Sequence, residues 1–424
     1  MLSKEENALL CQVGPGTPMG NLLRRYWMPF AAAAEMDETP TKPVRLMGED
    51  MALYKDKSGT YGLVELHCPH RRADLSYGMV EEDGLRCNYH GWKFNEKGDC
   101  LSQPFEESSH PDSHFKDKVK VKAYPVQEKA GLLWAYMGPS PVPELWDWDI
   151  YNEKGYKTIV FSPIPGNWLQ CAENDIDPVH FEWLHSNWTA DLKGERDANN
   201  NRIAKHLEIA FEEFEWGYEY KRRLNNSDEW QVGRVALGPN CLSVSHFEWR
   251  VPVDDDNTLS VCWNIDLMDG DEPYVQEKVP YFWSPIKDEK TGRWINTHTV
   301  QQDIIAWVGQ GVKSDRENEH LGASDEGVIL LRRKLLDDIK VVEQGGDPKG
   351  ILRDPSRNHS LHLPRPNGGI GLNAPRPRIG QPGGHSVAWS LYAGLPKEIE
   401  DDIDRVFRER DRARQADRVQ ERVL

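Results

Sequence analysis

Two short pairs of cysteine and histidine lie close together in the first quarter of the chain. Cys68 and His70 are separated by one residue, and Cys87 and His90 are separated by two. Thiolates and neutral imidazoles are both metal ligands, and two of each can hold a single zinc ion or a [2Fe–2S] cluster. The spacing therefore predicts a metal centre of one of these two kinds.

The composition of each pair favours the iron–sulfur cluster. Structural zinc sites usually open with two cysteines and close with two histidines, whereas each pair here mixes one of each. Two thiolates on one iron and two imidazoles on the other is the ligand set of a Rieske [2Fe–2S] centre, which carries single electrons. Pro69 stiffens the first loop, and Gly91 allows close backbone approach after the second. A zinc site remains the alternative.

A second set of metal-binding residues follows the pattern D-x2-H-x4-H at Asp177, His180 and His185. Two imidazoles and one carboxylate with open positions form the facial triad of non-haem Fe(II) oxygenases. On a regular helix, the two histidines would lie roughly 140° apart, so they could share one iron only if the helix is distorted or broken. Asp177 falls between them and is predicted to accept an imidazole N–H.

The carboxylate of such a triad must come from elsewhere in the chain, and three aspartates are candidates. Asp303 lies just before an apolar helical turn. Asp315 lies in a charged run that is typical of a solvated surface, and Asp325 is typical of a helix N-cap. The pattern alone leaves all three open.

Composition excludes several classes of function. The chain of 424 residues has 69 acidic and 52 basic residues, a net charge of −17, which argues against binding to nucleic acid or to an anionic membrane surface. No window approaches the length of about eighteen apolar residues that a membrane span needs. The N-terminal segment carries acids where a secretion signal has an apolar core, so we expect a cytoplasmic protein.

The order of predicted elements indicates an α+β protein. Residues 1 to about 30 are expected to form short helices, and residues from about 40 to 140 short strands with frequent turns. The stretch 138–148 has three prolines and is predicted to be a boundary. Beyond it we expect a helix over 167–186, antiparallel strands, a helix over 317–342 and a charged helix after Pro396.

Together with these two sets of residues, several longer motifs make the chain resemble a known family. It resembles the oxygenase (α) component of the Rieske non-haem iron aromatic-ring oxygenases, in the branch that contains phthalate dioxygenase. The resemblance spans nearly the whole chain. It is carried by GTPMGNLLRRYWMPF, CPHRRADLSYG, RCNYHGWKF, the motif from Asn167 to His185, QQDIIAWVGQG and DRENEHLGASDEGVILLRRKLL.

The resemblance implies a fold and domain boundaries. We expect N-terminal helices over 1–40 that pack on the catalytic domain, an all-β Rieske domain over 41–145, and a catalytic domain over 146–424 that ends in a C-terminal helix. The catalytic domain should have an antiparallel sheet flanked by helices, in a helix-grip-like arrangement.

The resemblance also implies the ligands and partners. The four residues of the two pairs would bind the cluster, and His180, His185 and Asp303 would bind mononuclear Fe(II). Asp177 would connect cluster and iron across a subunit boundary, which implies a homotrimer or a hexamer of stacked trimers. Because the chain has no nicotinamide or flavin motif, its electrons should come from a separate reductase, with or without a ferredoxin.

The activity implied is oxidation of an aromatic carboxylate with O2. We favour O-demethylation of a methoxylated lignin-derived acid, with formaldehyde release, over ring cis-dihydroxylation. An iron–sulfur electron carrier without oxygenase activity is an alternative from another class. A carboxylate needs a cation, and Arg222, Arg223, Arg234 and Arg250 are candidates, although each competes with a salt-bridged or outward-facing role. Further candidate substrate contacts are Asn174, Trp183 and Trp263.

Overall fold

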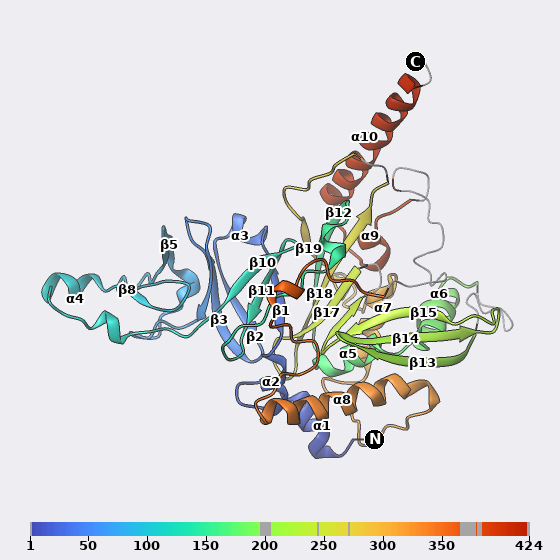
Figure 1. Ribbon diagram of the computed structural model, residues 1–424, viewed down its shortest axis with the longest axis horizontal. Coiled ribbons are helices and arrows are strands. Elements are labelled where there is room, and N and C mark those ends of the chain that lie inside the picture. The colour runs from blue at the N-terminus through green and yellow to red at the C-terminus, as the bar shows by residue number, and fades with distance from the viewer. Residues whose placement is uncertain are drawn as a thin grey trace.

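The computed structural model describes residues 2–195, 205–243, 246–269, 272–364, 379 and 384–421. The chain has a β-rich first lobe and a larger second lobe in which helices flank one wide sheet (Figure 1). The predicted α+β class is therefore confirmed. Within the described ranges, no helix is both long enough and apolar enough to cross a membrane.

The first lobe is built from small antiparallel sheets. Its strands are β1 (Trp27–Ala32), β2 (Thr41–Leu46), β3 (Glu49–Lys55), β4 (Tyr61–Glu65), β5 (Met79–Glu81), β6 (Gly84–Arg86), β7 (Lys93–Phe94), β8 (Cys100–Ser102), β9 (Ala123–Tyr124), β10 (Val126–Lys129) and β11 (Leu132–Tyr136). They are arranged as β2-β3-β4-β9, β5-β6-β7-β8 and β1-β11-β10. The short helices of this lobe are α3 (Glu35–Glu38), α4 (Pro104–Ser109), η1 (Leu75–Tyr77) and η2 (Lys116–Lys118).

The N-terminal helices are shorter than the sequence predicts. Ser3 and Glu6 form a capping box that starts α1 (Lys4–Cys11), and the Thr17 side chain caps α2 (Pro18–Leu23). Residues 27–32 are then a strand, β1, which pairs with β11. Every residue of β1 is buried, so its sequence has no polar alternation that would separate a strand from a helix.

The second lobe contains one eight-stranded sheet among its described residues. Its order is β13-β14-β15-β16-β17-β18-β12-β19, and its pairs are antiparallel except that β19 runs parallel to β12. The expected antiparallel sheet is thus present with one parallel edge. The strands are β12 (Gly155–Ile164), β13 (His206–Phe214), β14 (Gly217–Leu224), β15 (Gln231–Leu237), β16 (Cys241–Ser243), β17 (His246–Pro252), β18 (Thr258–Leu267) and β19 (Tyr281–Trp283).

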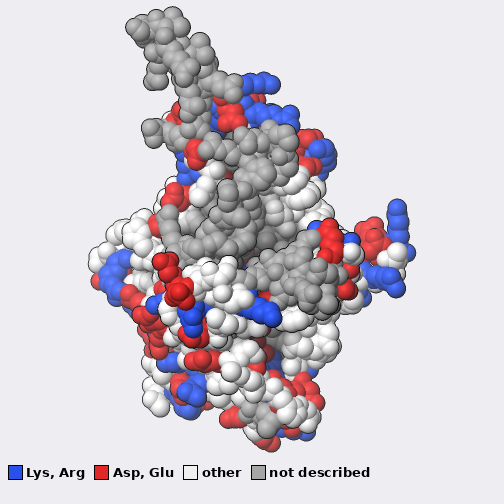
Figure 2. All heavy atoms as spheres, turned by 90° about the vertical axis from the view of Figure 1, so that its right-hand side faces the viewer, with Lys and Arg blue, Asp and Glu red and all other residues white. Residues whose placement is uncertain are grey.

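The helices of the second lobe position the chemistry. They are η3 (Asp149–Asn152), α5 (Trp168–Asp175), the π-helix η4 (Phe181–Asn187), α6 (Trp188–Leu192), α7 (Thr299–Gly309), η5 (Ala323–Asp325), α8 (Glu326–Glu343), η6 (Pro355–Arg357), α9 (Val387–Leu391) and α10 (Lys397–Glu421). The helix predicted over 317–342 begins only at Glu326, after the turn η5. The charged helix α10 extends away from the body (Figure 1), and acidic and basic side chains lie interspersed on the face that Figure 2 shows.

The two lobes share one apolar core. Trp134 of β11 packs edge-on against Trp249 of β17, with ring centroids 5.1 Å apart. The indole N–H of Trp168 on α5 donates to the carbonyl of Leu10 on α1 at 3.2 Å. The two lobes therefore pack directly against each other, and β1, which lies within the segment 1–40 expected to form helices, completes a sheet of the first lobe.

Candidate metal centres

The helix predicted over 167–186 is broken, and the break brings the two histidines together. Helix α5 ends at Asp175, and Pro178 removes a backbone donor from the segment that follows. His180 then starts a π-helix, in which hydrogen bonds join residues five apart. Because His180 and His185 are five residues apart, this winding places them on one face, with ring centroids 5.3 Å apart.

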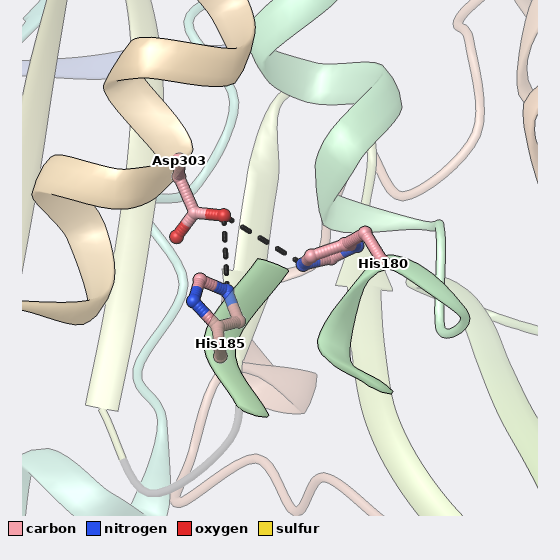
Figure 3. A group of neighbouring side chains, drawn as sticks. All are labelled: His180, His185 and Asp303. Atoms are coloured by element: carbon pink, nitrogen blue, oxygen red, sulfur yellow. Dashed lines mark ion pairs between the residues drawn. The ribbon is translucent and has the colours of Figure 1, made fainter. Parts of the chain in front are cut away.

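The third member of this group is Asp303, on α7. Its Oδ1 lies 3.1 Å from Nε2 of His185 and 3.6 Å from Nε2 of His180 (Figure 3). Candidate ligand atoms of the three side chains all lie within 4.8 Å of one another. Of the other candidates, Asp315 instead accepts a hydrogen bond from the Asn318 side chain, and Asp325 accepts one from the backbone N–H of Gly322.

The triad fits a divalent metal ion. His180 Nε2 and Asp303 Oδ1 are buried and have no hydrogen-bond partner among the described protein groups. Among the described residues, Asp303 Oδ1 faces the two imidazoles, at 3.1 and 3.6 Å, and a cation bound between the three side chains would satisfy these buried atoms. Two imidazoles and one carboxylate are the ligand set that non-haem iron prefers. Iron held there would supply a site at which O2 is reduced.

Gln302 orients His185, and the sequence analysis missed it. Its Oε1 lies 3.0 Å from Nδ1 of His185, and its Nε2 donates to Oγ1 of Thr189 at 2.8 Å and to the carbonyl of Asn296 at 3.1 Å. Because the amide nitrogen has two acceptors, the oxygen faces the imidazole and Nδ1 carries the proton. Nε2 is then free for a metal. The only available signal was its place directly before Asp303.

Asp177 lies beside His180, the first histidine of the triad. Its Oδ2 lies 3.4 Å from Nδ1 of His180, and its Oδ1 accepts the backbone N–H of Val179 at 2.8 Å. Burial alone would raise the pKa of Asp177, but the hydrogen bond and charge of His180 and the backbone N–H groups hold it below its ordinary value. The carboxylate is therefore ionised and can hold His180 in place.

The two Cys–His pairs meet at one end of the first lobe. Cys68 follows β4, and its backbone N–H donates to the carbonyl of Ala73. Cys87 lies between β6 and β7, and its backbone N–H donates to the carbonyl of Trp92. Both thiols are buried, whereas the rings of His70 and His90 are exposed and lie 4.6 Å apart. The site that the two pairs form therefore has a buried side, which carries the two sulfurs, and an exposed side, which carries the two imidazoles.

The four residues fit a [2Fe–2S] cluster with mixed ligands. Burial raises the pKa of the Cys68 thiol to about 12, while the backbone N–H of His70 opposes the shift. A thiolate at this position therefore needs a bound cationic group, and both thiols are free of disulfide bonds. The His70 ring stacks on Trp92, with centroids 4.4 Å apart, which holds that imidazole in position.

The five candidate substrate residues lie in different environments in the structure. Trp263 is fully buried, and its indole N–H donates to the carbonyl of Ala130 at 3.0 Å, so it belongs to the core rather than to a pocket wall. Trp183, by contrast, lies on the surface with 54% of its area exposed. Asn174 is half-buried near the end of α5, and its carbonyl accepts the backbone N–H of Asp177.

Arg250 is occupied by protein partners. It is 1% exposed, and each of its three guanidinium nitrogens donates to a side chain. The acceptors are Asp175 at 2.8 Å, Glu248 at 2.6 Å and Ser260 at 2.9 Å. This network argues against the expectation that Arg250 binds substrate, because its charge is already balanced by two buried carboxylates.

Arg234 remains as a cation near the triad, and Arg222 lies on the neighbouring strand β14. Arg234 lies over the ring of Phe181 at 4.7 Å, and its charge acts on His185. Arg222 on β14 contacts the imidazole of His206 at 3.3 Å. Both guanidiniums are buried, and among the described residues neither forms an ion pair with a carboxylate. Arg223, on the same strand, pairs with Glu208 at the surface.

Comparison with known proteins agrees with this geometry. Residues 26–125 match the family model of the Rieske [2Fe-2S] domain, and residues 250–361 match the family model described as LigXa C-terminal domain like. The 5,5'-dehydrodivanillate O-demethylase oxygenase subunit of Sphingobium sp. is 52% identical over 86% of this chain and 87% of its own length. The phthalate 4,5-dioxygenase oxygenase subunit of Pseudomonas putida is 32% identical over 81% of this chain and 88% of its own length.

Solved structures share the fold at low sequence identity. NdmA of Pseudomonas putida CBB5 superposes with a TM-score of 0.55 at 20% identity, over 78% of this chain and 96% of that chain. The terminal oxygenase of carbazole 1,9a-dioxygenase from Novosphingobium sp. KA1 gives a TM-score of 0.51 at 19% identity, over 74% of this chain and 94% of that chain.

The cluster-binding lobe and the histidine–carboxylate triad thus define an iron-dependent oxidoreductase that incorporates O2. The chain belongs to the Rieske non-haem iron oxygenases, as an oxygenase subunit with a Rieske [2Fe–2S] cluster and a mononuclear iron. The zinc site and the simple electron carrier are not supported, because the matches extend through the second lobe.

Proposed function

We propose that this subunit removes a methyl group from a methoxylated aromatic acid in the cytoplasm, with release of formaldehyde. The reaction consumes one O2, two electrons and two protons, and yields a phenol, formaldehyde and water. The observation that carries the proposal is the 52% identity, over most of both chains, to a subunit that demethylates dehydrodivanillate. His180, His185 and Asp303 would hold the iron, and the two Cys–His pairs would hold the cluster.

The two metal sites lie in different lobes of one chain, which supports a role for a second copy of the chain. The strands β5 to β8, which carry the second Cys–His pair, lie at one end of the molecule, whereas α7, which carries Asp303, lies in the other lobe (Figure 1). We infer a homotrimer, or a hexamer of two trimers, in which the exposed His70 and His90 approach Asp177 of a neighbour. Asp177 would then position His180 and connect the two centres.

The electrons would come from a separate reductase, with or without a ferredoxin. A related oxygenase, that of carbazole 1,9a-dioxygenase, has been solved in complex with a ferredoxin, at a TM-score of 0.51 to this chain. The exposed imidazole side of the cluster site offers an entry for electrons.

An acidic substrate is supported by Arg234 and Arg222. A buried guanidinium without a carboxylate partner is costly, and a substrate carboxylate would offset that cost with charge-assisted hydrogen bonds. Nε of Arg234 and Nε of Arg222 both have no hydrogen-bond partner among the described groups. Arg234, whose charge acts on His185, would hold an aromatic acid by its carboxylate while its methoxy group faces the iron, and Arg222 on the neighbouring strand would add positive charge.

Product analysis tests the proposal. Purified protein with both metal centres, NADH and a generic reductase would be given dehydrodivanillate, vanillate or phthalate. We expect one formaldehyde per substrate consumed from a methoxylated acid, and none from an Asp303→Ala control. The rival function is ring cis-dihydroxylation, which the 32% identity to the phthalate 4,5-dioxygenase subunit favours. A diol formed without formaldehyde would establish that rival instead.

A further inference from the structure

Three buried polar side chains lie side by side across three neighbouring strands of the large sheet. They are Thr158 on β12, Asn264 on β18 and His246 on β17, and none is more than 2% exposed. Thr158 pairs with Asn264, and Asn264 pairs with His246, in ladders that run without a bulge. Oγ1 of Thr158, Nδ2 of Asn264 and Nδ1 of His246 have no hydrogen-bond partner among the described protein groups. Buried polar atoms are nearly always paired, so these three indicate a partner other than the chain itself.

This row of three side chains lies on the face of the sheet that helix α7 covers. Side chains alternate along a strand, so Val160 and Cys262, each two residues from a member of the row, lie on the same face as the row. Both belong to one buried apolar group with Ile304 and Trp307 of α7. The same helix supplies Asp303 to the triad, so the row and the triad share one side of the sheet.

Arg234 on β15 belongs to the same row. Val235, Ser243 and Phe247 pair across β15, β16 and β17, and they therefore share the opposite face of the sheet. Since β15 and β17 both run antiparallel to β16, the residues directly before Val235 and Phe247 lie together in the next row, on the α7 face. Those residues are Arg234 and His246. With neighbouring strands about 4.8 Å apart, their backbones are separated by about 10 Å.

Arg234 connects this row to the triad. Its guanidinium lies 4.7 Å from the ring centre of Phe181 on η4, and its charge acts on His185. The row thus begins beside the candidate iron site and continues over His246 and Asn264. A molecule whose carboxylate pairs with Arg234 can place its other substituents along this row.

His246 and Asn264 offer one acceptor and one donor. Nε2 of His246 lies 2.7 Å from Oε1 of Glu248. Burial alone would raise the pKa of Glu248, but the charge of Arg250 and the hydrogen bond of His246 hold it well below its ordinary value. The carboxylate is therefore ionised and accepts the proton on Nε2, which leaves Nδ1 as an acceptor. Oδ1 of Asn264 accepts the Cys262 thiol at 3.4 Å, so Nδ2 of the same amide is the open donor.

We propose that His246 and Asn264 bind a hydroxyl group on the aromatic ring of the substrate. The hydroxyl oxygen accepts a hydrogen bond from Nδ2 of Asn264, and the hydroxyl proton is donated to Nδ1 of His246. A methoxy group or a carboxylate can only accept, so neither satisfies both atoms at once. The two side chains therefore select phenolic acids over their fully methylated counterparts. This inference rests on the proposed function, because it takes the substrate to be an aromatic acid held at Arg234.

The binding of two acids to the complete protein tests this inference. Calorimetry without O2 compares dehydrodivanillate, which has phenolic hydroxyls, with the same acid after methylation of those hydroxyls. We expect the parent protein to bind the phenolic acid at least about tenfold more tightly, because the methylated acid leaves buried polar atoms unpaired. This comparison needs no variant, and equal affinities would overturn the inference.

A variant separates the hydrogen bond from the size of the added methyl groups. Asn264→Leu keeps the volume and removes the donor, so it should lose about tenfold in affinity for the phenolic acid and little for the methylated acid. Ser162→Ala, which removes another buried hydroxyl from the same face of β12, is the control and should keep the preference of the parent. Equal losses for both acids in Asn264→Leu would indicate a structural role and would also overturn the inference.

Failure of this inference differs from failure of the proposed function. A protein that binds neither acid would show that the proposed substrate class is wrong, and the inference would be rejected with it. A protein that binds both acids equally and still releases formaldehyde would show that only the hydroxyl contact is wrong.

Discussion

Nδ1 of His185 lies 3.0 Å from Oε1 of Gln302, and this contact selects the tautomer that leaves Nε2 facing Asp303. One amide, itself fixed by two acceptors, thus determines which imidazole nitrogen can bind iron.

Replacing Gln302 with leucine should weaken iron binding at the triad. The variant loses the acceptor that orients His185, and loss of such a partner typically costs about 10–100-fold in metal affinity. Iron titration of the metal-free protein measures the change, with the cluster content as an internal reference. Gln310→Ala, at the exposed end of the same helix, is the control and should bind iron normally. Equal affinity in the leucine variant would contradict this role.

Asp177→Asn should retain both metal centres and slow turnover severely. The amide keeps the shape of the carboxylate but loses the charge that holds His180 at 3.4 Å. Iron and sulfide analysis checks the metals, and single-turnover oxidation of the reduced cluster measures electron transfer to the iron. A variant that oxidises its cluster at the normal rate would show that Asp177 does not connect the two centres.

Arg234→Gln should raise the KM for an aromatic acid and leave kcat nearly unchanged. The substitution removes a buried cation that has no carboxylate partner among the described residues. A bidentate charged pair contributes roughly 1.5–3 kcal/mol, so the KM should rise by at least about tenfold. The matching methyl ester, which carries no charge, should show no such difference between variant and parent. A similar loss for acid and ester would point to a structural role.

Glu173→Gln should destabilise the whole chain. Oε2 of Glu173 accepts a hydrogen bond from Arg316 at 2.7 Å, Oε1 accepts one from Arg332 at 2.6 Å, and all three side chains are buried. Removing one partner of a buried ion pair typically costs about 3–5 kcal/mol. Thermal unfolding measures the loss. Asp337→Asn, in the exposed pair with Lys340, should change stability by less than about 1 kcal/mol.

Acid should remove a contact that braces the second Cys–His pair. Hydrogen bonds from Arg86 lower the pKa of Glu81 to about 2, and Arg86 also donates to the carbonyl of Gly91 at 2.6 Å. Since the folded pKa lies below the unfolded one, this stabilisation is present above about pH 4.5 and disappears towards pH 2. Glu81→Gln should therefore lose its cluster faster than the parent at pH 7. The difference between variant and parent in the rate at which the cluster absorbance bleaches should be smaller at pH 3. An equal difference at both pH values would contradict this role of Glu81.

The cysteine and histidine candidates could be found in the sequence because each pair is local, whereas the pattern alone did not separate Asp303, on a distant helix, from Asp315 and Asp325. Cys68 and His70, or His180 and His185, are read from spacing alone, and the fold only has to bring two such sets together. The π-helix could not be predicted, because no residue type is specific for it. It was anticipated only as a distortion that the two histidines require.

Other features had no local signal. Arg250 meets Asp175 across 75 residues, so nothing near either residue showed that the arginine is neutralised. The strand β1 lacks alternation because all its residues are buried, and it was read as part of a helical segment.

The indole contact between Trp134 and Trp249 crosses from the electron-carrying half of the chain to the oxygen-reducing half. A fragment excised at residues 41–145 would lose β1 and expose Leu133 and Trp134 to water, so we expect it to aggregate rather than serve as a portable redox module. Engineers who wish to exchange electron donors on this scaffold should therefore alter the docking surface and leave the halves fused.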